Sequence, residues 1–391
     1  MRKPLEGCRI VDFGIITAGA ATSALLADLG ADVIKVESPT YRDPFRAWSS
    51  DSMSLEGGPE CPAFFRSNNR GKRGISIDLK QPRGREAALR LVGRSHVVLD
   101  NFSRGVLERL GLDAETMRRA NPDIILLSIS GQGAAGPDAK QISYGSTLEA
   151  VGGLAWLTGY AGGPPVVSGR DLNYPDQIVS LFAAGVVLAA WLQRQGVGMG
   201  GAALDVCQRE LTSFLVGEAF LAAEEGEAPA RSGNAVPEFA VQGCYRSGDG
   251  LWVAVTVEEA ALHALGALLG TAEDAALATL DAALAAWMSG ADAATRVAAL
   301  SASGIAAAAV RSGGDLAAGG APSWDHAFGV TPEGALIKAL PFRIDPAPFT
   351  MARDAPAVGQ HTAAVLHEIA GYEEAEILDM AARGIIECRE G

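Results

Sequence analysis

Short apolar runs rich in β-branched residues alternate with helical patterns along the first third of the chain. The strand-like runs are CRIVDFG (residues 8–14), DVIKVE (32–37), GISIDL (74–79), SHVVLDNF (95–102) and DIILLSISG (123–131). Apolar residues at helical spacing lie between them, at residues 20–29 and 84–93. Strands that alternate with helices favour a parallel sheet covered on both faces. The pattern therefore predicts an α/β fold with a large, Rossmann-like parallel-sheet domain.

The pattern changes in the second half of the chain. A long apolar helix is expected over residues 175–193, and residues 224–249 are rich in Gly, Pro, Ala and charge, as in a linker. The strand-like run LWVAVTV and an Ala-rich helical stretch over residues 260–318 follow. We therefore predict a large domain over residues 1–223, a linker over 224–249, a smaller α+β domain over 250–330, and a linker with a C-terminal segment over 331–391.

Charge and composition exclude several classes of protein. The net charge of −14 argues against nucleic acid as the main partner, although a local basic pocket for a small anion is compatible with it. The longest apolar run, residues 181–192, is shorter than the roughly 20 residues that span a bilayer, so we predict a buried helix. The five cysteines are scattered, and the start MRKPLEGCRIVDFG lacks the apolar core of a signal peptide. These features predict a cytoplasmic protein without a membrane partner.

The first strand-to-helix turn, GIITAGA, resembles the start of a dinucleotide-binding unit, with Glu37 ending the next strand. The glycines do not fit that motif, because Gly14 and Gly19 are not spaced as in G-x-G-x-x-G. An ordinary βαβ unit explains the pattern, and its helix start still offers backbone N–H groups to a phosphate or a polarised carbonyl.

Basic residues gather in the segment FFRSNNRGKRGISIDLK. They are Arg66, Arg70, Lys72, Arg73 and Lys80. A solvated loop and a pocket for a multiply phosphorylated ligand explain them equally well. After the next predicted strand, Asn101 suits a turn, Phe102 fills the core or stacks on an aromatic ring, and Arg109 is a surface base or a ligand contact.

Asp176 follows Pro175 at the start of the long apolar helix. An acidic residue in a first turn commonly stabilises the helix dipole, and the functional alternative is a positioned carboxylate nucleophile. No G-x-S-x-G motif is present, and the histidines show no metal-binding spacing: His96, His263, His326, His361 and His367. Serine hydrolysis and metal catalysis are therefore not expected.

Six segments, in order and over nearly the whole chain, resemble the class III coenzyme A (CoA) transferases. They are LEGCRIVDFG with LLADLGADVIKVESP, NRGKRGISIDLK, LDNFSRGVLERLGL, NPDIILLSISGQGAAGP, RSGNAVPE with YRSGDGLWVAV, and APAVGQHTAAVLHEI. The resemblance implies a large α/β domain, a small domain, a C-terminal segment that returns to the large domain, and a homodimer of interlocked subunits.

The resemblance also implies roles for single residues. The catalytic aspartate falls at Asp176, with Asp171 as the alternative, because this stretch is longer than in formyl-CoA transferases. The expected CoA contacts are Thr17, Ala18, Ile77, Asp78, Leu79, Lys80, Asn101, Phe102, Ser103 and Arg109, with Lys72 and Arg73 in the basic segment that binds phosphate. Position 17 is Thr instead of Gln, position 38 is Ser instead of Arg, and the glycine-rich active-site loop is missing. These departures argue against formyl-CoA and oxalate as substrates.

The implied reaction moves CoA between carboxylic acids through an anhydride and then an aspartyl-CoA thioester. An ordinary aspartate has a pKa of about 3.9, and the helix start is expected to keep Asp176 ionised. Backbone N–H groups near Ala18 are expected to stabilise the tetrahedral oxyanion. One alternative is an α-methylacyl-CoA racemase, whose His–Asp pair has no counterpart in the segment KQISY (residues 140–144). The other is a CoA-binding protein without turnover.

Overall fold

A computed structural model describes residues 3–47, 61–168, 172–198, 200–227, 229–272, 274–318, 328–332, 334–342, 344, 351 and 353–389. Contacts divide the chain into two compact units. The first comprises Met1–Leu154, Val167–Gly217 and Ser323–Gly391, and the second comprises Ala155–Val166 and Glu218–Pro322.

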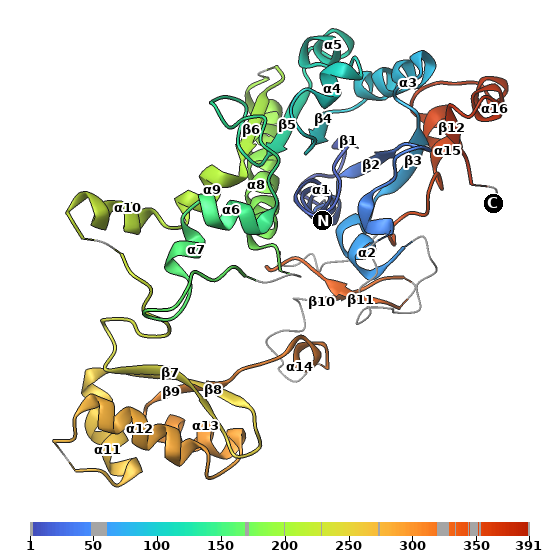
Figure 1. Cartoon of the computed structure of the whole chain (residues 1–391). Helices are drawn as coiled ribbons and strands as arrows, with labels where there is room; N and C mark the ends of the chain where they lie inside the picture. The colour runs from blue at the N-terminus through green and yellow to red at the C-terminus, as the bar shows by residue number, and fades with distance from the viewer. Residues whose placement is uncertain are drawn as a thin grey trace. The chain divides into compact units, whose positions relative to one another are not determined.

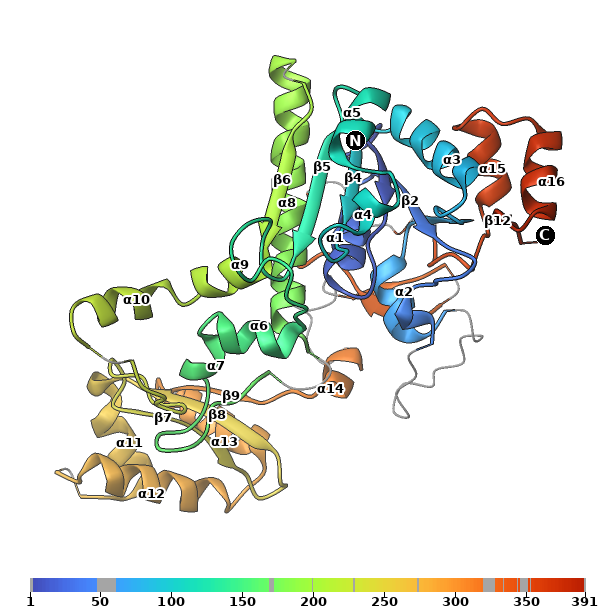
Figure 2. The same cartoon turned by 45° about the horizontal axis from the view of Figure 1, so that its top comes forward.

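The first unit is built on a seven-stranded sheet with the strand order β12-β3-β2-β1-β4-β5-β6 (Figures 1 and 2). The strands are β1 (Arg9–Asp12), β2 (Asp32–Glu37), β3 (Arg73–Ile77), β4 (Val97–Asp100), β5 (Ile125–Ser130), β6 (Ala203–Cys207) and β12 (Ile386–Glu387). Strands β1 to β6 run parallel, and β12 pairs antiparallel with β3. The predicted α/β fold with a large parallel sheet is confirmed. Strands β6 and β12 were not among the predicted strands.

Side chains on the central strand β1 alternate between the two faces of the sheet. Ile10 packs with α1 (Ala18–Asp28) and α8 (Tyr174–Val197) on one face. Val11 packs on the other face, with α3 (Pro82–Gly93), α15 (Thr362–Glu368) and α16 (Glu374–Ala382). The remaining helices of this unit are η1 (Pro44–Arg46), α2 (Ala63–Asn69), α4 (Val106–Arg109), α5 (Ala114–Ala120), α6 (Gly145–Val151) and α9 (Gln208–Phe214), and its hairpin is β10 (Phe328–Val330) with β11 (Leu336–Lys338).

Helix α8 is longer than the apolar run that predicted it. Among the described residues, Tyr174–Gly196 is the one helical stretch that is long and apolar enough to cross a membrane by length and composition, and 39% of an apolar 18-residue segment within it is buried. Its inner side packs against α1, whereas Leu181, Phe182 and Leu192 on its outer side are exposed. The expectation of a buried helix is therefore correct for one side of α8 and wrong for the other.

The second unit contains a three-stranded antiparallel sheet, β7-β8-β9. Its elements are β7 (Val241–Arg246), β8 (Trp252–Val257), η2 (Glu259–Ala261), α11 (Leu262–Leu269), α12 (Leu277–Met288), α13 (Ala293–Ala302), β9 (Ala306–Ala309) and α14 (Gly313–Ala317). Helices α7 (Leu154–Leu157) and α10 (Gly217–Glu224) lie at the unit boundaries in the sequence. Strand β7 falls within residues 224–249, where the sequence predicted a linker. The prediction missed this strand because it is short and lies between stretches rich in Gly and charge.

The C-terminal segment lies against β3 and the turn before it. The Gly71 N–H donates to the Arg353 carbonyl over 3.0 Å, and the His361 N–H donates to the Gly74 carbonyl over 2.9 Å. The Ser76 N–H donates to Thr362 Oγ1 over 3.0 Å. Figures 1 and 2 both show α15 and β12 beside β3. Residues far apart in the sequence therefore complete one side of the sheet.

Candidate active site

The predicted site residues follow three parallel strands at the carboxyl edge of the sheet. Thr17 and Ala18 come after β1, the stretch 77–80 ends β3 and begins the next loop, and residues 101–103 follow β4. The strand order reverses between β1 and β4, so the loops after these two strands leave the sheet in opposite directions. Ligands of open α/β sheets bind at such a switch point. The topology brings the predicted residues to the edge where a ligand is expected.

The turn after β1 is held by side chains. Asp12 Oδ1 accepts the Gly14 N–H over 2.7 Å. Asn101 Oδ1 accepts the Ile15 N–H over 2.8 Å, and Asn101 Nδ2 donates to the Ile15 carbonyl over 3.1 Å. A Cβ at Gly19 would lie 2.6 Å from Asn101 Oδ1, so only glycine fits there. The Asn101 side chain therefore holds the turn after β1 through both ends of its amide.

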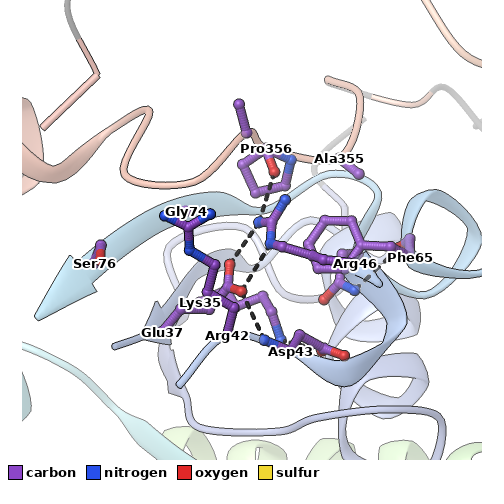
Figure 3. Close-up of polar contacts among 12 residues, drawn as sticks. Lys35, Glu37, Arg42, Asp43, Arg46, Phe65, Gly74, Ser76, Ala355 and Pro356 are labelled. Carbon is purple, nitrogen blue, oxygen red and sulfur yellow. Dashed lines mark hydrogen bonds and ion pairs between the residues drawn. The ribbon is translucent and has the colours of Figure 1, made fainter. Parts of the chain in front are cut away.

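Buried ion pairs surround the same turn. Lys35 Nζ donates to the Gly14 carbonyl over 2.7 Å and to Asp43 Oδ2 over 2.9 Å, and neither charged side chain is exposed. Glu37 pairs with Arg46 over 2.5 Å, and Arg46 also donates to the Pro356 carbonyl over 3.0 Å. Figure 3 shows Arg46 between Glu37 and Pro356. Buried charges need such partners, and this arrangement fixes the turn to β2 and to the C-terminal segment.

The basic segment divides into buried and exposed parts. Lys72 Nζ is fully buried and donates to Asp12 Oδ2, the Ala20 carbonyl and Asn69 Oδ1 over 2.8–3.0 Å. Arg73 forms a two-point ion pair with Asp32. Their positions give no support to the prediction that Lys72 and Arg73 bind phosphate, since internal acceptors occupy both cations.

Other predicted contacts face the solvent or the core. Lys80, Ser103 and Arg109 are exposed. Ile77, Asp78 and Leu79 are buried, and Asp78 Oδ1 accepts the Lys80 N–H over 3.0 Å. Phe102 packs partly against the core. Lys80 and Arg109 are therefore the predicted basic contacts that remain accessible to an anion.

Asp176 lies in the first turn of α8, after Asn173 in a left-handed conformation at φ 44°. Asp176 Oδ1 accepts a hydrogen bond from Gln208 Nε2 over 2.5 Å. Ser180 Oγ donates to the Asp176 carbonyl over 2.6 Å and lies 3.2 Å from the Ala18 carbonyl. The starts of α1 and α8 are therefore in contact, one helical turn from the predicted nucleophile. Asp171, the alternative nucleophile, lies outside the described residues.

Burial changes the acidity of Asp176. Desolvation raises its pKa to about 6, although the hydrogen bond from Gln208 acts in the opposite direction. The expectation of an ordinary pKa is therefore wrong, because the effect of burial on the pKa of Asp176 outweighs that of the hydrogen bond from Gln208. Roughly nine tenths of the carboxyl groups are still ionised at pH 7, so the carboxylate remains available as a nucleophile.

Sequence reasoning missed three polar residues at this site. Gln208 directly follows β6, but that strand was not recognised because it is short and preceded by glycines. Lys35 is a charged residue in the middle of an apolar strand, and this was a signal that it had a buried partner. The partner, Asp43, comes from the following loop, and nothing in its local pattern marks it.

The fold and site are those of a Rossmann-like α/β protein with a partly buried carboxylate at the carboxyl edge of the sheet. Among the described residues, no group of three His, Cys, Asp or Glu side chains is arranged to hold a metal ion. A family model described as CoA-transferase family III matches residues 5–362. The chain belongs to CoA-transferase family III.

Three relatives resemble part of the chain. Succinate–glutarate CoA-transferase of Agrobacterium fabrum is 32% identical over 69% of this chain and 67% of its own length. Succinyl-CoA–D-citramalate CoA-transferase of Chloroflexus aurantiacus is 33% identical over 65% and 61%. Succinyl-CoA:glutarate CoA-transferase of Mus musculus is 37% identical over 51% and 44%. The matched part of the chain thus spans between 44% and 67% of the length of these relatives.

A solved structure resembles nearly the whole chain. The crystal structure of a CAIB/BAIF family protein from Brucella suis superposes with a TM-score of 0.85 at 29% sequence identity. It covers 94% of this chain, and the match spans 100% of the Brucella chain.

Proposed function

We propose that the protein is a CoA transferase that moves CoA from an acyl-CoA to a carboxylic acid through covalent intermediates on Asp176. The observation that carries this proposal is the position of Asp176 in a member of CoA-transferase family III. Its carboxylate is partly buried, oriented by Gln208, and adjacent to the start of α1 at the ligand-binding edge of the sheet. The KQISY segment lacks the His–Asp pair that a racemase would need, so transfer is favoured.

The carboxylate can carry out each step without a general base. Asp176 attacks the thioester carbonyl, the tetrahedral oxyanion collapses, and the CoA thiolate leaves behind an acyl-aspartyl anhydride. The thiolate attacks the aspartyl carbonyl, which releases the donor acid and gives an aspartyl-CoA thioester. The acceptor carboxylate displaces the thiolate to form a second anhydride. The thiolate then attacks the acceptor acyl carbon, which yields the new acyl-CoA and restores Asp176.

Helix starts stabilise the negative charge that appears in these steps. The first N–H groups of α1 lack intrahelical acceptors and carry a partial positive charge. Ser180 Oγ contacts both the Ala18 carbonyl and the Asp176 carbonyl, so the start of α1 lies beside the first turns of α8. We assign the first N–H groups of α1 the oxyanion-stabilising role, which typically contributes about 10²–10³ in rate for one donor.

The substrates of the relatives favour short dicarboxylic acids. The names of the three relatives pair succinate or succinyl-CoA with glutarate or D-citramalate. We therefore expect CoA transfer from succinyl-CoA to glutarate, detected by mass spectrometry of the acyl-CoA products. Propionyl-CoA and butyrate serve as matched monocarboxylate controls. No new acyl-CoA from any pair in a broad panel would contradict the transferase proposal.

Lys80 and Arg109 are the proposed contacts for the phosphates of CoA. Replacing either with Ala should weaken CoA binding by about 1–3 kcal/mol, the scale of a charge-assisted contact. Calorimetry measures the affinity. Arg118→Ala is the control, because this exposed base ends α5 at the opposite edge of the sheet and should leave the affinity unchanged. Unchanged affinity in both test variants would place the phosphates elsewhere.

The outer side of α8 supports a homodimer. Leu181, Phe182 and Leu192 are 43–65% exposed, and the exposed residues Gly185 and Ala189 lie between them along α8. Exposed apolar side chains on one helix are typical of an interface, and the family resemblance implies a second copy of the chain, interlocked with the first. Light scattering should give a dimer at micromolar concentration. Phe182→Glu with Leu192→Glu should disrupt it, whereas Leu378→Glu on α16 should not. A monomeric wild-type protein would contradict this proposal.

A further inference from the structure

Side chains, rather than regular secondary structure, determine the conformation of the turn between β1 and α1. The Gly14 N–H and carbonyl are bound by Asp12 and Lys35. The Ile15 N–H and carbonyl are both bound by Asn101. These partners come from β1, β2 and the loop after β4, so the turn is tied to three neighbouring strands of the sheet.

Ile16 has the strained conformation in this turn. Its φ of 60° lies in the left-handed region, and besides Asn173 it is the one non-glycine residue among those described with a positive φ. A β-branched residue is strongly disfavoured there and persists only where its surroundings impose the conformation. Asp43 Oδ1 accepts the Ile16 N–H over 3.3 Å. The strained residue of the turn is therefore also the residue whose backbone N–H is bound by Asp43.

Asp43 is itself fixed from several directions. Its Oδ2 accepts from Lys35 Nζ over 2.9 Å, its Oδ1 accepts the Phe45 N–H over 3.0 Å, and its own N–H donates to Glu37 Oε1 over 3.0 Å. Asp43 is 2% exposed. Figure 3 shows Asp43 near Lys35 and Glu37. Such a carboxylate can impose a conformation, because it has no freedom to follow the turn if the turn relaxes.

The left-handed conformation places the Ile16 side chain on a small apolar cluster. Phe45, Phe65 and Ala355 form the buried part of this cluster, and Ile16 packs against it. The Arg46 guanidinium stacks 3.7 Å from the Phe65 ring centroid and binds the Pro356 carbonyl. The C-terminal segment therefore packs against this cluster through Ala355 and Pro356. We call the set of contacts that hold the turn between the sheet and this segment the clamp.

The position of this turn matters for the proposed reaction. Thr17 and Ala18 follow Ile16 directly, and the Ala18 carbonyl lies 3.2 Å from Ser180 Oγ, on the helix that carries Asp176. A relaxed Ile16 would rotate the peptide that leads into α1 and so move the start of α1 relative to α8. Misplacement of about 1 Å can lower a reaction rate about 10²-fold.

We propose that Asp43, held by Lys35, is a positioning residue for CoA transfer: it keeps Ile16 left-handed and so keeps the start of α1 beside Asp176. The proposal rests on the proposed function for its catalytic consequence. The clamp itself is a property of the fold and can be measured without turnover.

The test compares three variants. Asp43→Asn keeps the size of the side chain but turns an N–H₂ group toward the Lys35 ammonium. We expect kcat to fall at least about tenfold, equivalent to about 1.4 kcal/mol, with little change in KM for the acyl-CoA. Adding Ile16→Gly should restore kcat severalfold, because glycine adopts a positive φ at no steric cost. Asp28→Asn is the matched control, because this carboxylate has a buried partner, Arg70, at the other end of α1.

Hydrogen exchange provides a second measurement that does not depend on activity. Amides of residues 13–18 should exchange about tenfold faster or more in Asp43→Asn than in the wild type and in Asp28→Asn. Unchanged exchange in this segment overturns the clamp, even if the wild type transfers CoA. Equal losses of kcat in Asp43→Asn and Asp28→Asn, or no restoration by Ile16→Gly, overturn the positioning role. If the wild type transfers no CoA, the proposed function fails and the exchange rates alone decide whether the clamp exists.

Discussion

Asp176→Ala will abolish CoA transfer, with a loss in kcat on the order of 10⁴–10⁶, as for the removal of other nucleophiles. The protein should stay folded and still bind CoA, because the proposed phosphate contacts are elsewhere: Lys80 follows β3 and Arg109 ends α4. With the acyl-CoA donor present, hydroxylamine should inactivate the wild type by cleaving the anhydride or the enzyme thioester. Borohydride should reduce the thioester to an alcohol at Asp176, and peptide mass spectrometry should locate the change.

The control for Asp176 is another aspartate at a helix start. Asp113 caps α5 by accepting the Thr116 N–H over 2.9 Å, so it stabilises a helix start and has no proposed part in catalysis. Asp113→Ala should lower stability slightly and leave transfer intact. Full transfer by Asp176→Ala, with no labelled peptide, would sink the covalent mechanism. A label on Asp171 would keep the mechanism and change the nucleophile.

The raised pKa of Asp176, about 6, determines how the reaction should depend on pH. The carboxylate is the reactive form, so kcat should fall as the pH decreases through about 6 and level off above it. The folded protein holds the proton more tightly than the unfolded chain, so this carboxyl group makes stability decrease as the pH rises from its ordinary value of 3.8 toward 6. Asp176→Asn should therefore be at least as stable as the wild type at pH 7, despite its loss of activity.

Lys72→Met will destabilise the protein by about 3–5 kcal/mol, the usual effect of removing one partner of a buried ion pair. The variant leaves the Asp12 carboxylate buried without its cation and removes the donor to Asn69 and the Ala20 carbonyl. Burial already lowers the pKa of Lys72 to about 8, which shows that its partners only partly offset the desolvation. Chemical denaturation with urea measures the change.

Two further variants distinguish a structural Lys72 from a ligand-binding one. Lys80→Met, on an exposed lysine of the same basic segment, should change stability by no more than about 0.5 kcal/mol. The double variant Asp12→Asn with Lys72→Met should recover part of the loss, because it removes both buried charges. If Lys72→Met kept its stability and lost CoA affinity, the phosphate-binding role predicted from the sequence would be correct.

The sequence predicted the sheet well because the strands of a buried parallel sheet are nearly continuous apolar runs. The runs at residues 8–14, 32–37 and 123–131 each contain a strand of the structure. Strand β12 escaped notice because it is two residues long and forms only by pairing with β3. Local pattern carries no information about a partner so far away in the sequence.

The candidate site was harder to predict because the charge of a residue does not reveal whether its side chain points into the core or toward the solvent. Lys72 and Lys80 belong to one basic segment, yet Lys72 is fully buried and Lys80 is exposed. The difference arises because Lys72 directly precedes β3 and its ammonium group binds the Ala20 carbonyl of α1, Asp12 and Asn69. The resemblance to a family placed Asp176 at the site, whereas its acidity depended on burial that only the folded structure defines.

Strand β12 has a consequence for how the chain is made. Ser76 of β3 pairs with Glu387 of β12. A ribosome must therefore add about three hundred residues after β3 before this side of the sheet can form. The whole of the second unit is synthesised in that interval. During it, β3 presents an open edge with unpaired backbone groups, which can join to the edge of another nascent chain. The first unit can therefore be completed only after the second unit has been synthesised, and chaperones that shield strand edges would have their greatest effect during that interval.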